Sequence, residues 1–305
     1  MDLSSTLARH QERLSDLPAL GFGTSYAGSR TVVGHGPDSS YRIASLTKAF
    51  TSAALLLELR DRGIPTSTPV ADLLPALKPD WRADRGLTVD QVLAQVSGLR
   101  ESVDAAAVAA LGDGPDAIVE SARLVVAAGS DRPPGSAWSY YNGNYFLAGA
   151  LLEALSETSY EAALQRRLLD PWGLGRTGFS GPADYPRGRR PSGGLWSSVD
   201  DLITFGERLL SDDDLVARLA RRRTPAADPM AYGAGWAIGR SGQLYLNGRL
   251  PDYRAALLLV PAHRLVCVAL AHQQDALPVL AAVLSDLQRP LTGDDLSVAI
   301  DAFAA

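Results

Sequence analysis

Cysteine and histidine are scarce in this chain of 305 residues, which has one cysteine and four histidines. A single cysteine excludes a disulfide within the chain. Cys267 lies in the apolar run RLVCVAL, where a buried strand position is expected rather than a nucleophile or a metal ligand. No histidine, cysteine and carboxylate residues cluster at the spacing of a metal site, so the sequence predicts neither a metal nor an organic cofactor.

An excess of positive charge and long apolar runs are also missing. The formal net charge of −5 leaves no broad cationic field, so we expect no nucleic-acid partner. The one dense basic patch, Arg221, Arg222 and Arg223, is interpreted as the solvated end of a helix. No run of 18 apolar residues occurs, and residues 1–17 alternate charges with leucines as an amphipathic helix does. We therefore expect no membrane span, no signal peptide and a cytoplasmic location.

Strand patterns occur near both ends of the chain, and helical patterns lie between them. Residues 21–36 read as two short strands around a Gly-Ser turn, which predicts a hairpin. Between residues 232 and 272 four short apolar segments have the spacing of a β-meander, and residues 275–288 have the pattern of a closing helix. From about residue 65 to 190 the periodic segments are helical.

This order predicts an α/β (α+β) fold. Because the two strand groups flank the helical insertion, the simplest architecture is one antiparallel sheet built from both ends of the chain. The sheet would be flanked by N- and C-terminal helices and joined to an all-helical lobe. The sheet domain would comprise residues 1–64 and 190–305, the helical domain residues 65–189, and the active site would lie in the cleft between them.

Lysine is the rarest charged residue type, because only Lys48 and Lys78 occur among 29 basic residues. Arginine keeps its proton in proteins, whereas a desolvated lysine can have its pKa lowered enough to accept one. Lys48 stands in an apolar helix pattern three residues after Ser45, and residues at this spacing share one helix face. The pair favours a serine activated by a lysine base. The alternative is a serine that caps the helix and a lysine that snorkels to solvent.

Serine needs a partner to become a nucleophile, and the chain has neither a GxSxG motif nor a recognisable histidine triad. A second group of residues supports the interpretation of Lys48 as the base. Tyr140 and Asn142 lie in a turn-rich segment before a strong helix pattern, where a phenol can shuttle a proton and an amide can orient a substrate. The alternative for this pair is a buried tyrosine and a helix-capping asparagine.

From about residue 40 to 272 these motifs together resemble the serine β-lactamase and penicillin-binding protein superfamily, in particular its class C-like and esterase branch. The resemblance is carried by several segments in the same order along the chain: YRIASLTKAFTSAALLLELRDRG, PVADLLP, LTVDQVLAQVSGL, PPGSAWSYYNGNYFLAGALLEALSETSYEAALQRRLLDPWGLGRTGF, SGGLWSSVDDLITFGERLL and YGAGWAIG.

The resemblance implies a role for each matching residue. Ser45 would attack a carbonyl and form an acyl-enzyme, Lys48 would accept its proton, and Tyr140 would relay a proton to the leaving group. Asn142 would hold the acyl side chain. The oxyanion hole would combine the backbone N–H of Ser45 with one N–H of an edge strand after Leu246.

The third motif of the family is altered in this chain. Relatives carry Lys-Thr-Gly or His-x-Gly on that strand, and the segment QLYLNGRLPDYRAAL aligns best with Leu246, Asn247 and Gly248 as the triplet. The basic or imidazole residue is thus a leucine, which argues against ordinary β-lactam hydrolysis. Arg249 or Arg254 could supply a nearby positive charge, and the alternative for each is a surface arginine.

These residues predict a serine hydrolase or acyltransferase that works through an acyl-enzyme. Its partners would be a small ester, amide or activated acyl substrate and, for transfer, an amine or alcohol acceptor. An esterase, an amide hydrolase and a biosynthetic transacylase all use the same first half-reaction. The alternative from another class is a catalytically retired scaffold that binds a small ligand or a partner, and the retained Ser45, Lys48, Tyr140 and Asn142 argue against it.

Overall fold

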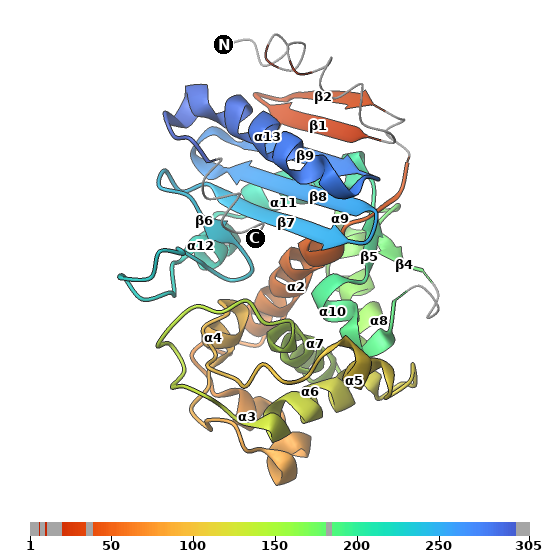
Figure 1. Cartoon of the computed structure of the whole chain (residues 1–305), viewed down its shortest axis with the longest axis vertical. Helices are drawn as coiled ribbons and strands as arrows, with labels where there is room; N and C mark the ends of the chain where they lie inside the picture. The colour runs from red at the N-terminus through yellow and green to blue at the C-terminus, as the bar shows by residue number, and fades with distance from the viewer. Residues whose placement is uncertain (1–5, 7–9, 11–19, 35–38, 181–184, 297–305) are drawn as a thin grey trace.

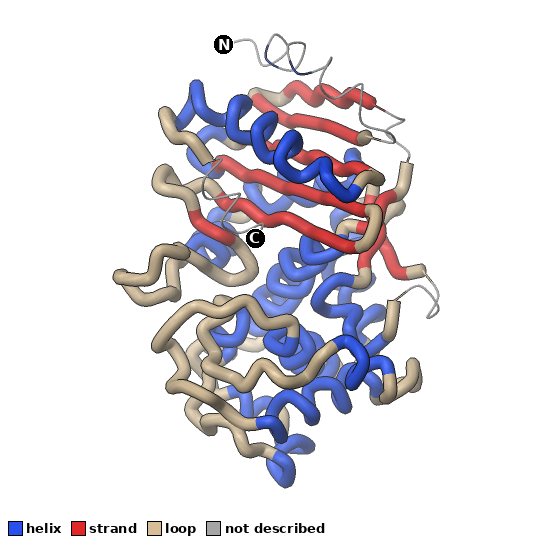
Figure 2. Tube along the Cα trace, in the orientation of Figure 1, coloured by secondary structure: helices blue, strands red, loops and turns tan. Residues whose placement is uncertain are grey.

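A computed structural model describes residues 6, 10, 20–34, 39–180 and 185–296 (Figure 2). The amphipathic helix predicted over residues 1–17 therefore falls almost wholly outside the described residues, as does the end of the chain after residue 296. Within the described residues the predicted fold class is confirmed: strands from both ends of the chain form one antiparallel sheet, and helices fill the middle (Figure 1).

The main sheet has six strands in the order β2-β1-β9-β8-β7-β6, all joined by antiparallel pairs. The predicted hairpin supplies β1 and β2, and the predicted meander supplies the other four. The first meander strand is shorter than its pattern indicated. The bounds are β1 (Gly21–Tyr26), β2 (Ser29–Gly34), β6 (Ala237–Ile238), β7 (Leu244–Leu250), β8 (Tyr253–Val260) and β9 (Leu265–Ala271).

Helices cover both faces of the sheet. The C-terminal helix α13 (Leu277–Thr292) packs on β8 and β9, and it crosses the front of the sheet in Figure 1. Helix α11 (Val199–Leu210) packs on β1 and β9 from behind. Cys267 lies fully buried in β9, as its apolar run predicts. Strands covered on both faces read as near-continuous apolar runs, and β8 and β9 do so.

The inserted segment is helical with one small exception. Its β4 (Gly178–Phe179) joins β3 (Tyr41–Arg42) and β5 (Leu195–Ser197) in a second sheet that the sequence pattern did not indicate. The domain boundaries stay a prediction. The other helices are α2 (Thr47–Asp61), α3 (Val70–Leu73), α4 (Val89–Leu93), α5 (Ala105–Ala109), α6 (Ala117–Ala128), α7 (Gly143–Ser156), α8 (Tyr160–Leu164), α9 (Asp170–Trp172), α10 (Arg190–Gly193) and α12 (Asp213–Ala220).

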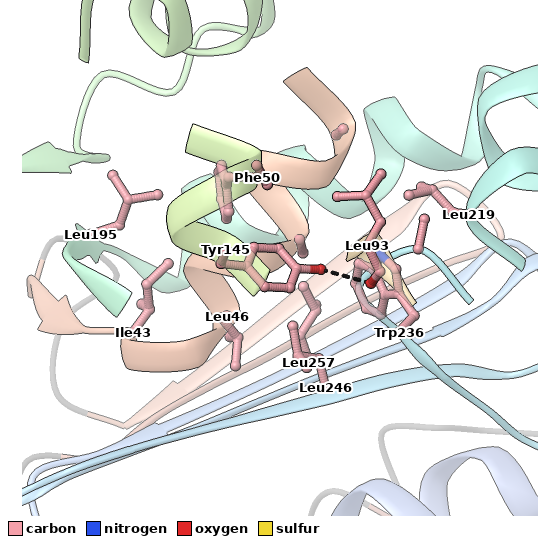
Figure 3. Close-up of a cluster of buried hydrophobic side chains, with 14 of the residues drawn as sticks. Ile43, Leu46, Phe50, Leu93, Tyr145, Leu195, Leu219, Trp236, Leu246 and Leu257 are labelled. Atoms are coloured by element: carbon pink, nitrogen blue, oxygen red, sulfur yellow. Dashed lines mark hydrogen bonds between the residues drawn. The ribbon is translucent and has the colours of Figure 1, made fainter. Parts of the chain in front are cut away.

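Helix α2 connects the sheet to the helical region and packs against α7 (Figure 1). It is buried nearly all round, as expected for a helix that is enclosed by other elements. Side chains of β7 and β8, Leu246 and Leu257, meet Leu46 and Tyr145 in one continuous core (Figure 3). The ring of Phe50 stacks on Phe205 of α11, with their centroids 3.8 Å apart. This packing fixes the start of α2 against the sheet.

The arginine run at residues 221–223 is not wholly solvated, which corrects the sequence-based interpretation. The run does follow the end of α12. The side chain of Arg223, however, is only 8% exposed, and its Nε donates to Asp90 Oδ1 at 2.6 Å. Burial lowers the pKa of Arg223, and Asp90 opposes that effect. The ion pair ties the end of α12 to α4, a contact between residues 133 apart that local pattern cannot reveal.

Candidate active site

Ser45 lies in a short 3₁₀ turn, Ala44–Leu46, that leads directly into α2. Its side chain is half-buried, whereas Ala44 and Leu46 on either side are buried, so solvent reaches the serine. Ala44 has a φ of 47°, in the left-handed region that costs a residue with a Cβ about 1–3 kcal/mol. The chain thus holds a strained backbone next to Ser45.

Lys48 is fully buried and makes three hydrogen bonds. Its Nζ donates to Ser45 Oγ at 3.1 Å, to Asn142 Oδ1 at 2.8 Å and to the backbone oxygen of Ser192 at 2.7 Å. A lysine with no exposed surface does not snorkel, and the helix start has no side-chain cap. The alternative interpretation of Ser45 and Lys48 as cap and solubiliser is therefore wrong.

The environment of Lys48 disfavours its charged form. Burial lowers the pKa of Lys48 well below its ordinary value, and the Arg189 guanidinium lowers it further. Among the described residues no carboxylate pairs with Nζ. The rings of Tyr140 and Tyr145, centred 4.8 and 5.4 Å from Nζ, favour the ammonium by about 1–2 kcal/mol, but burying an unpaired charge costs more. The amine is thus set up to be neutral.

Tyr140 approaches Ser45 from the segment before α7. Its hydroxyl donates to Ser45 Oγ at 2.7 Å. Burial raises the pKa of Tyr140, while the hydrogen bond with Ser45 and, more weakly, the Arg249 guanidinium oppose the rise. The net effect is upward, so the phenol is protonated at neutral pH and can donate a proton.

Asn142 occupies the N-cap position of α7, yet its side chain makes no capping hydrogen bond. Its Oδ1 accepts from Lys48 instead, so the interpretation of Asn142 as a helix cap is wrong. The structure therefore brings Ser45, Lys48, Tyr140 and Asn142, from two segments about 95 residues apart, into one network.

The third motif lies on β7, and its backbone faces the turn that holds Ser45. An added Cβ at Gly248 would lie 2.3 Å from the backbone oxygen of Ile43, so only glycine fits there. Leu246 is fully buried in the core. Because successive side chains of a strand point to opposite faces, Asn247 and Arg249 leave β7 on the face opposite Gly248. The substrate-binding role of Asn247, Gly248 and Arg249 stays a prediction.

The two arginines of this hairpin differ in their contacts. Arg254 Nη1 donates to the backbone oxygens of Leu250 at 2.8 Å and Tyr253 at 2.7 Å, so it holds the β7–β8 turn. Arg249 is exposed, and its charge reaches Tyr140. Arg249 thus acts on Tyr140 through its charge, from the face of β7 opposite the serine turn.

Gly248→Ala is expected to destabilise the protein by about 1–3 kcal/mol and to slow acylation of Ser45. The added methyl group would press on the Ile43 backbone and push β7 away from the serine turn. Urea unfolding and the rate of serine labelling measure the two effects. Gly175→Ala is the matched control, because a Cβ at Gly175 meets nothing within 4 Å and no positive φ is required there. Equal behaviour of the two variants would contradict the close approach.

Sequence reasoning missed Gln95 as a functional residue. It has a φ of 61°, and its backbone oxygen accepts from Ser139 N at 2.9 Å. Its Oε1 accepts from Tyr141 N at 3.0 Å and from Asn144 Nδ2 at 2.6 Å. Gln95 thereby fixes the backbone on both sides of Tyr140. Its place in the stretch LAQVSGL, which carries part of the family resemblance, was the available signal.

Gln95→Leu is expected to lower kcat by about 10- to 100-fold with little change in KM. The leucine leaves the Tyr141 N–H and the Asn144 amide without their buried acceptor, so Tyr140 shifts from Ser45. Gln95→Glu keeps the acceptor oxygen and should recover most of the rate. Steady-state kinetics on both variants separates positioning from general destabilisation, because a purely structural role predicts the same loss for both.

In the described part of the chain, neither the cysteine nor the metal-ligating side chain types form a second catalytic or metal site. Burial raises the pKa of the Cys267 thiol, so it stays protonated inside β9. Over the described ranges, no three His, Cys, Asp or Glu side chains gather as a metal site would require. No helix among the described residues has both the length and the apolar surface to cross a bilayer.

A family model described as beta-lactamase matches residues 19–284. The chain belongs to the beta-lactamase family. Protein flp of Staphylococcus aureus (strain MW2) is 24% identical over 269 residues, which cover 77% of this chain and 53% of that protein. The chain thus spans about half the length of the curated relatives it matches. The family assignment confirms the resemblance drawn from the motifs.

Solved structures show the same fold. The octameric penicillin-binding protein homologue from Pyrococcus abyssi superposes with a TM-score of 0.77 at 19% identity, covering 95% of this chain and 78% of that one. A D-stereospecific amidohydrolase from Streptomyces sp. gives a TM-score of 0.72 at 21% identity, covering 94% of this chain and 99% of that one. At these identities the likeness concerns the fold alone.

Proposed function

We propose that the protein is a serine hydrolase or acyltransferase that forms an acyl-enzyme on Ser45 with a small ester, amide or activated acyl substrate. The observation that carries the proposal is a fully buried lysine amine 3.1 Å from the oxygen of a half-buried serine. Such an amine can be neutral near pH 7 and take the serine proton.

The hydrogen bonds of Lys48 support this role. A neutral amine has two N–H donors, which the Asn142 and Ser192 oxygens accept, and its lone pair then faces Ser45 Oγ. Attack of Oγ on the acyl carbonyl forms the C–O bond while Lys48 takes the proton. The resulting ammonium is satisfied by the same three oxygens, so no rearrangement is needed.

The negative charge on the carbonyl oxygen needs donors where it develops. In the proposed hole one donor is the backbone N–H of Ser45 and the other is the backbone N–H of Arg249. Gly248 holds β7 against the serine turn, which supports this pairing of donors. Loss of one such donor would cost about 10²- to 10³-fold in rate.

Tyr140 would complete the cycle. As the carbon–leaving-group bond breaks, the phenol proton passes to the leaving atom, and the Lys48 ammonium neutralises the phenolate by giving up the proton that it took from Ser45. Its hydroxyl is 2.7 Å from that oxygen, and its raised pKa keeps the proton available. In deacylation, water or another acceptor would lose its proton along the reverse route.

The acceptor decides between hydrolysis and transfer. The D-stereospecific amidohydrolase has this fold and bears the name of an amide-cleaving enzyme, which supports amides among the substrates. The buried Leu246 in place of a cation supports a substrate other than an ordinary β-lactam. An intracellular, biosynthetic transacylase remains one form of the proposal.

Intact-protein mass spectrometry tests the proposal. After incubation with a fluorophosphonate or a p-nitrophenyl ester, the protein should gain one adduct, and peptide mapping should place it on Ser45. Amines and alcohols are then added to the acyl-enzyme. Faster release with a product that contains the acceptor identifies transfer, and release insensitive to acceptors identifies hydrolysis. A chain that takes up neither reagent is a binding scaffold, and the proposal is then wrong.

A further inference from the structure

Arg189 is an arginine beside the site that has no carboxylate partner among the residues that the structure describes. Its neighbours are paired: Arg187 donates to Glu153 and Glu161, and Arg190 donates to Glu161. Among the described residues no carboxylate lies within 4.0 Å of the Arg189 guanidinium, although the side chain is half-buried. An arginine held partly out of water without a counter-ion is disfavoured unless an anion joins it.

The position of Arg189 links it to the serine. Its guanidinium lies over the ring of Tyr185, 5.0 Å from the centroid. The Tyr185 hydroxyl lies 2.6 Å from where a Cβ on Gly193 would be, and that Cβ position is 3.7 Å from the carbonyl carbon of Ala44. The stacked pair therefore stands beside the residue that precedes Ser45.

The segment that carries Arg189 also holds the base. Ser192 accepts from Lys48 through its backbone oxygen, and its hydroxyl donates to the backbone oxygen of Arg189. The charge of Arg189 lowers the pKa of Lys48, as expected for a nearby cation without a counter-ion. Lys48 in turn bonds to Asn142, the side chain proposed to hold the acyl group, so Arg189 and Asn142 both act on the same amine.

We infer that Arg189, stacked on Tyr185, binds a carboxylate on the acyl group of the substrate. The guanidinium offers a planar fork of donors that matches a carboxylate, and the Tyr185 hydroxyl can add one more donor. The inference rests on the proposed function and narrows it to acyl donors that carry a negative charge away from the scissile bond. It also explains how a site whose β7 position 246 is leucine can recognise an anion.

Two p-nitrophenyl esters form the test. One carries a 4-carboxyphenylacetyl group and the other its neutral 4-carbamoyl analogue, so the leaving group and shape are kept while the charge changes. Wild type should prefer the carboxylate by about 10- to 100-fold in kcat/KM. Arg189→Met should erase the preference, so that both esters react at nearly the same rate, and any effect of the lost charge on Lys48 should change both rates by the same factor. Arg189→Lys should keep part of it, because the charge stays and the fork is lost.

Arg85→Met is the matched control, because it removes one exposed charge in the helical region and should preserve the preference. If Arg189→Met keeps the preference for the carboxylate ester and only shifts the pH profile of both reactions, Arg189 acts only on Lys48 and the inference is wrong. Equal use of both esters by wild type also overturns it.

Binding to the Ser45→Ala variant keeps this test apart from the proposed function, since it needs no turnover. Calorimetry should show tighter binding of the carboxylate ester, and the additional change Arg189→Met should abolish the difference. A charge preference in binding without serine labelling contradicts the proposed function alone. Serine labelling without a charge preference contradicts only the carboxylate site.

Discussion

Ser45→Ala is expected to remove turnover of p-nitrophenyl esters by a factor of about 10⁴ to 10⁶. The hydroxyl stands at the junction of the network, where both Lys48 Nζ and Tyr140 OH contact its oxygen. Without it, the oxyanion hole and the binding surface can assist only the slow attack of water. The remaining activity should show no burst and no covalent adduct.

The matched control for this loss is Ser211→Ala. Ser211 is exposed, and its hydroxyl donates to the backbone oxygen of Arg208 at the end of α11. We expect its rate to equal that of wild type and its stability to change by less than about 0.5 kcal/mol. Substantial turnover or labelling by the Ser45→Ala protein would mean that another residue is the nucleophile.

The sequence could predict the centre of the site because its key spacings are short. Ser45 and Lys48 are three residues apart, so a helix alone makes them neighbours. Tyr140 and Asn142 are two residues apart before a helix start, and the family resemblance assigned them to the same site. The structure brings the two pairs together through hydrogen bonds of 2.7 Å between Tyr140 and Ser45 and 2.8 Å between Lys48 and Asn142.

Contacts between residues far apart in the sequence could not be predicted from the local sequence pattern. Gln95 acts on the segment around Tyr140 some 45 residues away, and Ser192 reaches Lys48 across 144 residues. Arg223 seemed part of a solvated run until its pairing with Asp90 was visible. Strands of two or three residues, such as β3, β4 and β5, are too short to show an alternation.

The structure explains why the third motif, Leu246, Asn247 and Gly248 on β7, has a leucine at its first position, which the sequence alone could not explain. Leu246 packs in the core beneath the serine turn (Figure 3), and Gly248 keeps the strand close to it. Strand β7 thus contributes backbone and apolar contact where relatives contribute a charge. Cations stand instead at two other places, Arg189 near Lys48 and Arg249 near Tyr140.

Lys48→Arg is expected to lower kcat by about 10² to 10⁴-fold, because an arginine cannot release its proton to act as a base. Lys48→Met should lose at least as much, since it has no base at all. Wild-type kcat/KM should rise with pH through the lowered pKa of Lys48 and should not fall again near neutrality, because the pKa of Tyr140 is raised. Lys78→Met, which removes the other lysine, should keep the wild-type rate and profile; Lys78 is partly exposed, with Nζ 3.8 Å from Asp72.

The pH dependence of stability tests, without a substrate, whether Lys48 loses its proton in the folded protein. Between the lowered pKa of folded Lys48 and the ordinary value of 10.5, the unfolded chain holds a proton that the folded chain has lost. The unfolding free energy of wild type relative to Lys48→Met should therefore rise with pH across this window, by up to about 1.4 kcal/mol per pH unit. Below the window both states are protonated and the difference should be flat. Urea unfolding from pH 6 to 10.5 measures this difference. A flat line for the Lys48 pair would mean that the buried amine keeps its charge, and a charged amine cannot take the proton of Ser45.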